Sequence, residues 1–170
     1  KTMGLPGDAT YRVLLDKNYG SFSGSFGSTY NFSEKLLIRA NFAAAYRTPN
    51  LAELTSNGQH EIRYEIGNHD LIPENSFETD LSIHYHIDNF TFELAGFYNI
   101  INHYIYMSPT NDTTGSGIYI YRYMQSNSTL FGGEAGIHIH PNPLKWLHVE
   151  TTFSGVIGKK ENGDYLPFVP

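Results

Sequence analysis

The sequence has no cysteine, few charged residues and no long hydrophobic run, and each absence excludes a class of protein. Without cysteine, the chain has neither a disulfide framework nor a thiolate metal site. Charged residues make up only 16% of the chain, and 17 acidic residues outnumber 11 basic ones, whereas a nucleic-acid-binding protein would carry a basic face. No run approaches the roughly 18 consecutive apolar residues of a transmembrane helix.

Sequence motifs of common enzymes are missing as well. There is no Gly-x-Ser-x-Gly, no His-Glu-x-x-His and no phosphate-binding loop. Neighbouring carboxylates such as Glu78 and Asp80 alternate with apolar residues, which is typical of one polar face of a strand. We therefore expect a protein that is not an enzyme and that needs no cofactor.

The chain is rich in tyrosine and phenylalanine, with 13 and 11 residues, and apolar and polar residues alternate over most of its length. In one example, Leu36, Ile38 and Phe42 fall on one face, with Arg39 and Asn41 opposite. Alternation with a period of two predicts β-strands. The predicted fold class is all-β, an antiparallel β-meander of about six long strands.

The predicted connections alternate between short and long. Short turns fall near residues 31–35, 88–89 and 141–145, and long loops at about 47–76, 102–130 and 158–170. Strands of about 10 residues can cross a bilayer, and short turns on one side with long loops on the other are typical of outer-membrane barrels. Because one strand face carries no charge and the other carries carboxylates and histidines, we expect a lipid-facing and a lumen-facing side.

Several motifs follow one another in a fixed order. They are Tyr46-Arg47-Thr48-Pro49-Asn50-Leu51-Ala52-Glu53-Leu54, Ser56-Asn57-Gly58-Gln59-His60, Tyr64-Glu65-Ile66-Gly67-Asn68, Leu71-Ile72-Pro73-Glu74, Phe97-Tyr98-Asn99, Tyr121-Arg122-Tyr123, Gly132-Gly133-Glu134 and Leu166-Pro167. Each motif is weak alone, but the ordered set is similar to TonB-dependent outer-membrane receptors from roughly Gly20 onwards. His69 and Ile72 depart from the family pattern, in which Pro and Lys are common at those places.

The resemblance implies that residues 1–170 are an internal fragment of a transmembrane β-barrel of about 22 strands, a class whose lumen holds a plug. The implied function is outer-membrane transport of a scarce nutrient, an iron–siderophore or other metal chelate, in a Gram-negative bacterium. The implied partners are outer-membrane lipid, the plug domain of the same full-length chain, an inner-membrane energy-coupling protein that acts through the missing N-terminal region, and the small-molecule or metal-chelate ligand. No nucleic acid is expected.

A different class of protein has a similar strand pattern. A soluble, secreted all-β module that binds a ligand such as a glycan through Tyr-rich loops would also alternate apolar and polar residues. In that fold the apolar faces of two sheets pack against each other as a sandwich. The exposure of the apolar faces therefore distinguishes the two hypotheses.

The stretch 46–74 interrupts the alternation and predicts an internally structured loop. Thr48 can cap a short helix, Pro49 suits its first position, and Asn57-Gly58 can end it. We expect most of this loop to pack on itself in the barrel mouth. The expected anchors are Glu53, Glu65 and Glu74, which would bind backbone groups or the arginines Arg47 and Arg63.

The candidate ligand-binding residues lie in the first two long loops. They are His60, Arg63, Tyr64, His69, Tyr121 and Arg122. In the run 119–123, aromatic rings and an arginine can bind an anionic ligand. The same run is equally compatible with an interfacial aromatic girdle or a paired hairpin.

Histidines occur as i, i+2 pairs on the polar strand faces. His84 pairs with His86 and His138 with His140, and His148 can join the second pair. Such pairs can ligate zinc or copper, but polar residues ordinarily line the lumen of a barrel. We favour lumen lining, and the metal ligands, if any, stay unassigned.

Overall fold

The computed structural model describes residues 15–144, 146–167 and 169, and these are mostly β-strand. The elements are β1 (Gly24–Asn31), β2 (Leu36–Arg47), α1 (Leu51–Thr55), β3 (Asn57–His60), β4 (Arg63–Ile66), β5 (Glu74–Ile87), β6 (Phe90–Thr113), β7 (Tyr119–Ile139) and β8 (Val149–Lys160). The prediction of an all-β fold with about six long strands is confirmed; β3 and β4 are two further short strands. Phe168 and Pro170, at the end of the third predicted loop, lie outside the described residues, as do residues 1–14 of the predicted domain.

The chain divides into two compact units. We call them the loop unit, with described residues 15–21, 46–75 and 102–127, and the sheet unit, with residues 22–45, 76–101 and the described part of 128–170. The strands β6 and β7 contribute residues to both units. Within the described residues, no helix is long and apolar enough to cross a membrane.

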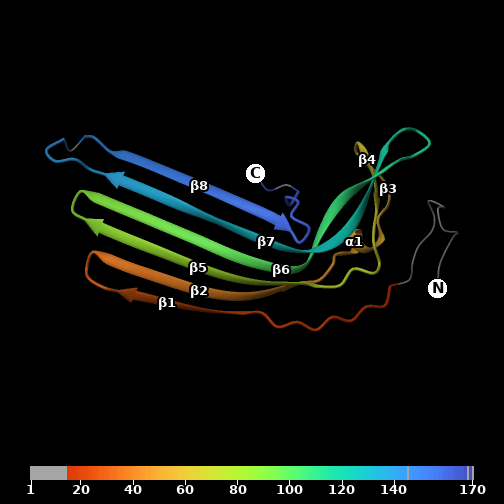
Figure 1. Ribbon diagram of the computed structural model, residues 1–170, viewed down its shortest axis with the longest axis horizontal. Coiled ribbons are helices and arrows are strands. Elements are labelled where there is room, and N and C mark those ends of the chain that lie inside the picture. Colours follow the sequence, from red (N-terminus) through yellow and green to blue (C-terminus); the bar gives the residue numbers. More distant parts are fainter. Residues whose placement is uncertain (1–14, 145, 168, 170) are drawn as a thin grey trace. The chain divides into compact units, whose positions relative to one another are not determined.

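The long strands of the sheet unit lie side by side in the order β1-β2-β5-β6-β7, and β8 pairs with β7 (Figure 1). The outer pairs are antiparallel: Phe26 of β1 lies opposite Phe42 of β2, and Phe131 of β7 lies opposite Ile157 of β8. This order follows the sequence, as the predicted meander requires. The sheet is not closed within this chain.

One face of this sheet exposes large apolar side chains. Phe26 and Phe153 are each 70% exposed, and Phe42 and Leu81 are 54% and 53% exposed. Isolated exposed apolar residues are ordinary, but a contiguous row on one face marks a surface that another apolar phase covers. The sandwich expected for a soluble binding module is wrong for this chain, because the residues that it would bury are exposed.

The opposite face carries polar side chains that join neighbouring strands. Four hydrogen bonds do so: Asn41 Nδ2 to Asp80 Oδ2 at 3.0 Å, Asn99 Nδ2 to Glu78 Oε2 at 2.7 Å, His84 Nδ1 with Glu93 Oε1 at 2.8 Å, and His86 Nδ1 with Thr91 Oγ1 at 2.7 Å. Each bond links residues on adjacent strands, so specific side-chain pairs join the strands on the polar face.

Gly132 shows why the Gly-Gly-Glu motif stands where it does. A Cβ atom at Gly132 would lie 2.8 Å from a ring carbon of Phe97 and would collide with the Gly155 carbonyl oxygen. The ring of Phe97 thus uses space that only a glycine leaves open. The motif allows an aromatic ring to lie across a strand on the otherwise polar face.

The connections agree with the prediction in part. The turns between β1 and β2 and between β5 and β6 fall at 32–35 and 88–89, as expected. The third connection, between β7 and β8, spans 140–148 and is longer than predicted, because Leu147 N–H bonds to the Leu144 carbonyl in a turn instead of starting the strand.

The prediction of a long loop at 102–130 is wrong in its secondary structure. Strands β6 and β7 occupy all of it except Thr114–Ile118, and they have 24 and 21 residues. In the run 119–123, Tyr alternates with Ile120 and Arg122, and aromatic and β-branched residues favour paired strands. Only the tip, where Gly117 has a φ of 82°, has the turn chemistry that the sequence suggested.

Candidate functional site

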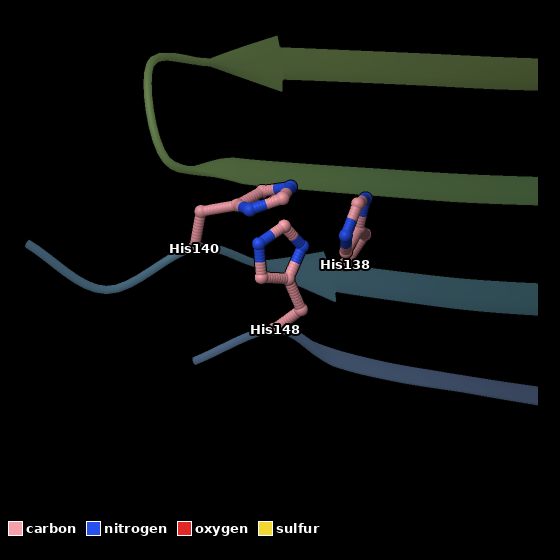
Figure 2. A group of neighbouring side chains, drawn as sticks. All are labelled: His138, His140 and His148. Atoms are coloured by element: carbon pink, nitrogen blue, oxygen red, sulfur yellow. The ribbon is translucent and has the colours of Figure 1, made fainter. Parts of the chain in front are cut away.

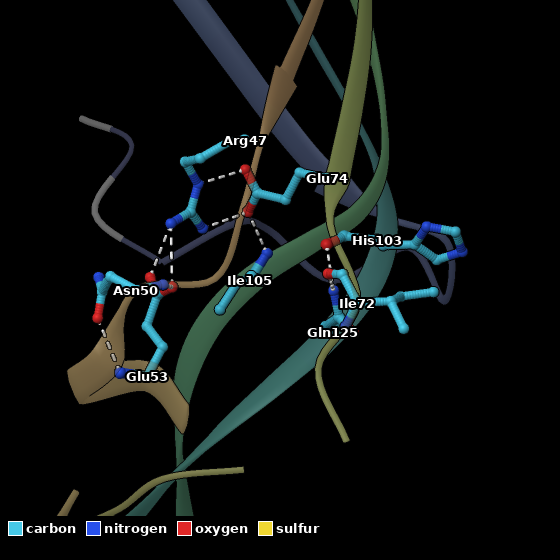
Figure 3. Close-up of polar contacts among 8 residues, drawn as sticks. All are labelled: Arg47, Asn50, Glu53, Ile72, Glu74, His103, Ile105 and Gln125. Carbon is cyan, nitrogen blue, oxygen red and sulfur yellow. Dashed lines mark hydrogen bonds and ion pairs between the residues drawn. The ribbon is translucent and has the colours of Figure 1, made fainter. Parts of the chain in front are cut away.

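The loop unit is built around Arg47, the last residue of β2 (Figure 3). Its Nη1 donates to both carboxylate oxygens of Glu53, at 2.9 and 3.1 Å. Its Nε and Nη2 each donate to one oxygen of Glu74, at 2.7 Å. Each charge-assisted hydrogen bond of this kind is about twice as strong as a hydrogen bond between neutral groups. Arg47 therefore ties together the end of β2, the helix α1 and the start of β5.

Both carboxylates bind backbone groups as well. Glu53 accepts a hydrogen bond from the Asn50 N–H at 2.8 Å, and Glu74 accepts one from the Ile105 N–H in β6. Their side chains are only 11% exposed, whereas that of Arg47 is 43% exposed. The expectation that Glu53 and Glu74 act as anchors for Arg47 and for backbone is confirmed.

The helix α1 begins two residues later than its expected cap would place it. Its N-cap is Asn50 and not Thr48: the Asn50 side chain accepts from the Glu53 N–H at 2.9 Å, while the Glu53 carboxylate accepts from the Asn50 N–H. This reciprocal capping box satisfies two helix N–H groups. Pro49 precedes the cap instead of occupying the first helical position. Asn57-Gly58 starts β3, since the helix already ends at Thr55 with Ser56 as its C-cap.

Apolar packing and one glutamine complete the loop unit. Leu54, Leu71 and Ile105 form its buried core. The Gln125 side chain, which no sequence motif singles out, donates to the Ile72 carbonyl at 2.6 Å and to the His103 carbonyl at 2.8 Å, and accepts from the Ile72 N–H at 3.0 Å (Figure 3). The segment before β5 is thereby fixed to β6 and β7.

Five of the six candidate ligand residues lie in a small three-stranded arrangement. β3 pairs antiparallel with β4, and β4 pairs parallel with the start of β7. The register places His60 opposite Arg63, and Glu65 opposite Tyr121. Side chains at alternate strand positions point to opposite faces, so the register divides the candidates into two groups.

One group is His60, Arg63 and Tyr121, gathered around Glu65. Arg63 Nε donates to Glu65 Oε1 at 2.7 Å, and the guanidinium lies over the Tyr121 ring at 5.9 Å from its centroid. His60 Nδ1 lies 3.9 Å from the same carboxylate oxygen. The hydrogen bond to Glu65 raises the pKa of Arg63, so this guanidinium is charged at any physiological pH. Glu65 anchors Arg63, as expected from the sequence.

Tyr64 and Arg122 lie on the other face of these strands. Tyr64 donates from its hydroxyl to Asn57 Oδ1 at 3.0 Å. Arg122 pairs in register with Ile66, is exposed, and makes no ion pair with any residue that the structure describes. The sixth candidate, His69, is exposed in the turn after β4, with its Nε2 atom 3.5 Å from Asp70 Oδ1. The six residues therefore do not converge on one point, and of the six Arg122 is the arginine that has no ion pair with a described residue.

The histidines of the sheet unit separate into two kinds. His84 and His86 have hydrogen-bond partners on β6, as polar lining requires. His138, His140 and His148 instead gather in one group, with ring centroids of neighbours 4.1 Å apart. The sequence pattern named both groups but did not distinguish them.

An open antiparallel sheet, apolar and exposed on one side and polar on the other, together with a tightly anchored loop, defines a segment of a membrane β-barrel. The family model described as TonB dependent receptor-like, beta-barrel matches residues 5–170. The chain belongs to this family.

Solved structures with the same fold are distant in sequence. The copper transporter OprC is 18% identical, with a TM-score of 0.72 over 87% of this chain and 22% of its own. The siderophore receptor PirA from Pseudomonas aeruginosa is 22% identical, with a TM-score of 0.66 over 82% of this chain and 28% of its own. A mutant of the ferric enterobactin receptor PfeA from the same organism, in complex with enterobactin, is 24% identical, with a TM-score of 0.55 over 85% of this chain and 23% of its own. The chain thus spans about a quarter of the length of these receptors.

Proposed function

We propose that this chain forms barrel wall and extracellular loops of an outer-membrane receptor that takes up an iron–siderophore complex in a Gram-negative bacterium. Membership of the TonB-dependent receptor family supports this proposal, together with similar structures that are described as siderophore and ferric enterobactin receptors. In this proposal the plug domain and the inner-membrane energy-coupling partner are supplied by the rest of the receptor and the cell.

The observation that carries the proposal is the contrast between the two faces of the sheet unit. Phe26, Phe42 and Phe153 expose aromatic rings on one face, while the other face is linked by side-chain hydrogen bonds. A membrane barrel needs an apolar outside and tolerates a polar inside. Strands of 12 and 14 residues, such as β2 and β5, exceed the roughly 10 residues needed to cross the bilayer.

The loop unit supplies the ligand contacts in this proposal. Ferric siderophore complexes with catecholate groups are anions, and an exposed arginine can donate several hydrogen bonds to such groups. Arg122 has no competing carboxylate among the described residues, whereas Arg63 is already held by Glu65. We therefore place Arg122 in direct contact with the ligand and Arg63, with Tyr121 beside it, in a stacking and positioning role.

Uptake by the full-length receptor tests the transport proposal. A strain in which this is the sole TonB-dependent receptor is given ⁵⁵Fe bound to enterobactin, to ferrichrome or to citrate, and separately Cu²⁺ or Zn²⁺ salts. Energy-dependent accumulation of one ⁵⁵Fe chelate supports the proposal. Uptake of Cu²⁺ or Zn²⁺ alone would replace the chelate with a free metal as substrate, and uptake of none by a surface-folded receptor would refute transport.

An arginine substitution tests the ligand contact. Arg122→Gln should weaken binding of the transported chelate by about tenfold, the lower end for a hydrogen bond to a charged group, because the site is exposed. Arg39→Gln is the matched control, since Arg39 is an exposed arginine of the sheet unit. Equal affinities of the wild type and of Arg122→Gln would remove Arg122 from the site.

A further inference from the structure

Three histidines meet where β7 passes into β8 (Figure 2). His138 lies in β7, His140 follows the end of that strand, and His148 precedes β8. The ladder pairs His138 with Glu150 and Ile139 with Val149, and its continuation brings His140 opposite His148. The i, i+2 pair at the end of β7 and the residue across from it therefore share one face of the sheet.

The rings are close enough to act together. The ring centroids of His138 and His140 lie 4.1 Å apart, as do those of His140 and His148. One ring nitrogen from each histidine can be chosen so that all three lie within 4.8 Å of one another. Three imidazole ligands of a tetrahedral zinc ion, at Zn–N distances near 2.1 Å, have nitrogens about 3.4 Å apart. Rotation of the side chains would close that difference when an ion binds.

We propose that His138, His140 and His148 bind a divalent transition-metal ion, such as Zn²⁺ or Cu²⁺. Imidazole nitrogen is a preferred ligand of both ions. Three histidines leave the fourth position of a tetrahedral ion open to water or to another ligand. Structural zinc sites, in contrast, have four protein ligands. Glu150, the cross-strand partner of His138, places a carboxylate on the same face, where it offsets part of the charge of the ion.

The other histidines of the same polar face show what a lining role looks like. His84 and His86 form a comparable i, i+2 pair, but the Nδ1 atom of each is hydrogen-bonded to a residue of β6. No hydrogen bond or ion pair joins the ring nitrogens of His138, His140 and His148 to any part of the chain that the structure describes. Their lone pairs are therefore available to an ion.

The three histidines and the proposed ligand contacts belong to different units. All three histidines belong to the sheet unit, whereas Arg63, Tyr121 and Arg122 belong to the loop unit. The proposal does not require that the receptor transport a metal chelate. The metal-site proposal can therefore be tested independently of the transported substrate.

Metal titration of the purified full-length receptor in detergent tests the site. After chelator treatment, ZnCl₂ is titrated by calorimetry into the wild type, His140→Asn and the triple variant H138N/H140N/H148N. We expect the triple variant to bind one Zn²⁺ fewer per chain. His140→Asn should bind that ion about 100-fold more weakly or worse, because changes in residues that merely orient ligands already weaken binding 10- to 100-fold. Identical titrations of all three proteins would overturn the proposal.

A matched control distinguishes the effect of losing this site from the effect of losing any histidines on the polar face. The double variant H84N/H86N removes an i, i+2 pair on the same polar face and should titrate like the wild type. With Cu²⁺, electron paramagnetic resonance should show nitrogen hyperfine structure from the wild type and from this control, but lose that component in the triple variant. Equal loss in the control and in the triple variant would count against a defined three-histidine site.

A measurement on the unmodified protein covers the case in which a variant fails to fold. Diethyl pyrocarbonate modifies accessible imidazoles, and mass spectrometry locates each adduct. Zn²⁺ should protect His138, His140 and His148 together while leaving the exposed His69 reactive. Equal modification of the three histidines with and without Zn²⁺ would refute the site.

Discussion

Replacing Arg47 with methionine should open the loop unit while the sheet unit stays folded. The change keeps much of the aliphatic length but leaves the carboxylates of Glu53 and Glu74 without a cation and with one backbone N–H bond each, although each is only 11% exposed. Breaking a buried ion pair by removing one partner destabilises by about 3–5 kcal/mol. Because Arg47 itself is 43% exposed, water replaces part of its contribution, and we expect a loss of about 2–4 kcal/mol.

Hydrogen–deuterium exchange of the full-length receptor in detergent measures this loss locally. The reporters are N–H groups whose bonds hold the loop unit together: Leu54 to the Asn50 carbonyl, Ser56 to Ala52, Gly67 to Ser56 and Asn68 to Glu53. A loss of about 2–4 kcal/mol corresponds to roughly 30- to 1,000-fold faster exchange. Amides in β1 and β2 of the sheet unit should keep their wild-type rates.

Two further variants decide whether charge pairing is the cause. Arg39→Met removes an arginine from the same strand that makes no ion pair with a described residue, and it should leave the reporters unchanged. The triple variant R47M/E53Q/E74Q removes the stranded charges and should recover part of the protection, because neutralising both sides of a contact is less harmful than removing one. Unchanged exchange in Arg47→Met would refute the anchoring role.

Two other predictions concern backbone packing in the same unit. Gly67→Ala would place a Cβ atom 2.6 Å from the backbone nitrogens of Thr55, the last residue of α1, and of its C-cap Ser56. It should destabilise the loop unit by about 1–3 kcal/mol in the same exchange experiment, whereas Gly58→Ala, which meets nothing within 4 Å, should not. Gln125→Leu removes three hydrogen bonds to the backbone of the loop unit. It should speed exchange at the Ile72 amide by about tenfold or more, since an unsatisfied buried group costs about 1–3 kcal/mol. Gln59→Leu, which loses one exposed hydrogen bond, is the control, and equal exchange rates in the two variants would contradict the role of Gln125.

The parts of the fold that could be predicted from the sequence are those set by local chemistry. Alternation over 36–46 specifies a strand and the exposed side of each residue without reference to the rest of the chain. The helix cap is different, because Thr48 and Asn50 are both good capping residues. Asn50 is the N-cap because of Glu53, whose carboxylate accepts hydrogen bonds from the Asn50 N–H and from Arg47.

The candidate site was predictable in residue type but not in arrangement. An arginine with two glutamates in an ordered loop suggested Arg47, Glu53 and Glu74, and the structure joins them. The division of Tyr121 and Arg122 between two faces follows from the parallel register of β4 with β7, which pairs Glu65 with Tyr121. Pairing between segments so far apart in the sequence cannot be read from a local pattern.

The exposed apolar face also bears on how this sequence can change over time. A side chain such as Phe26 or Phe153 meets few protein neighbours, and lipid tails accept Leu, Ile and Phe alike. A substitution there must keep the side chain apolar, but its shape matters little. In a packed core, in contrast, adding or removing a single methylene group changes the packing. On this face of the sheet unit, the sequence can thus vary among apolar residues without disturbing the backbone. A chain with 18% identity can therefore still superimpose on the copper transporter OprC with a TM-score of 0.72.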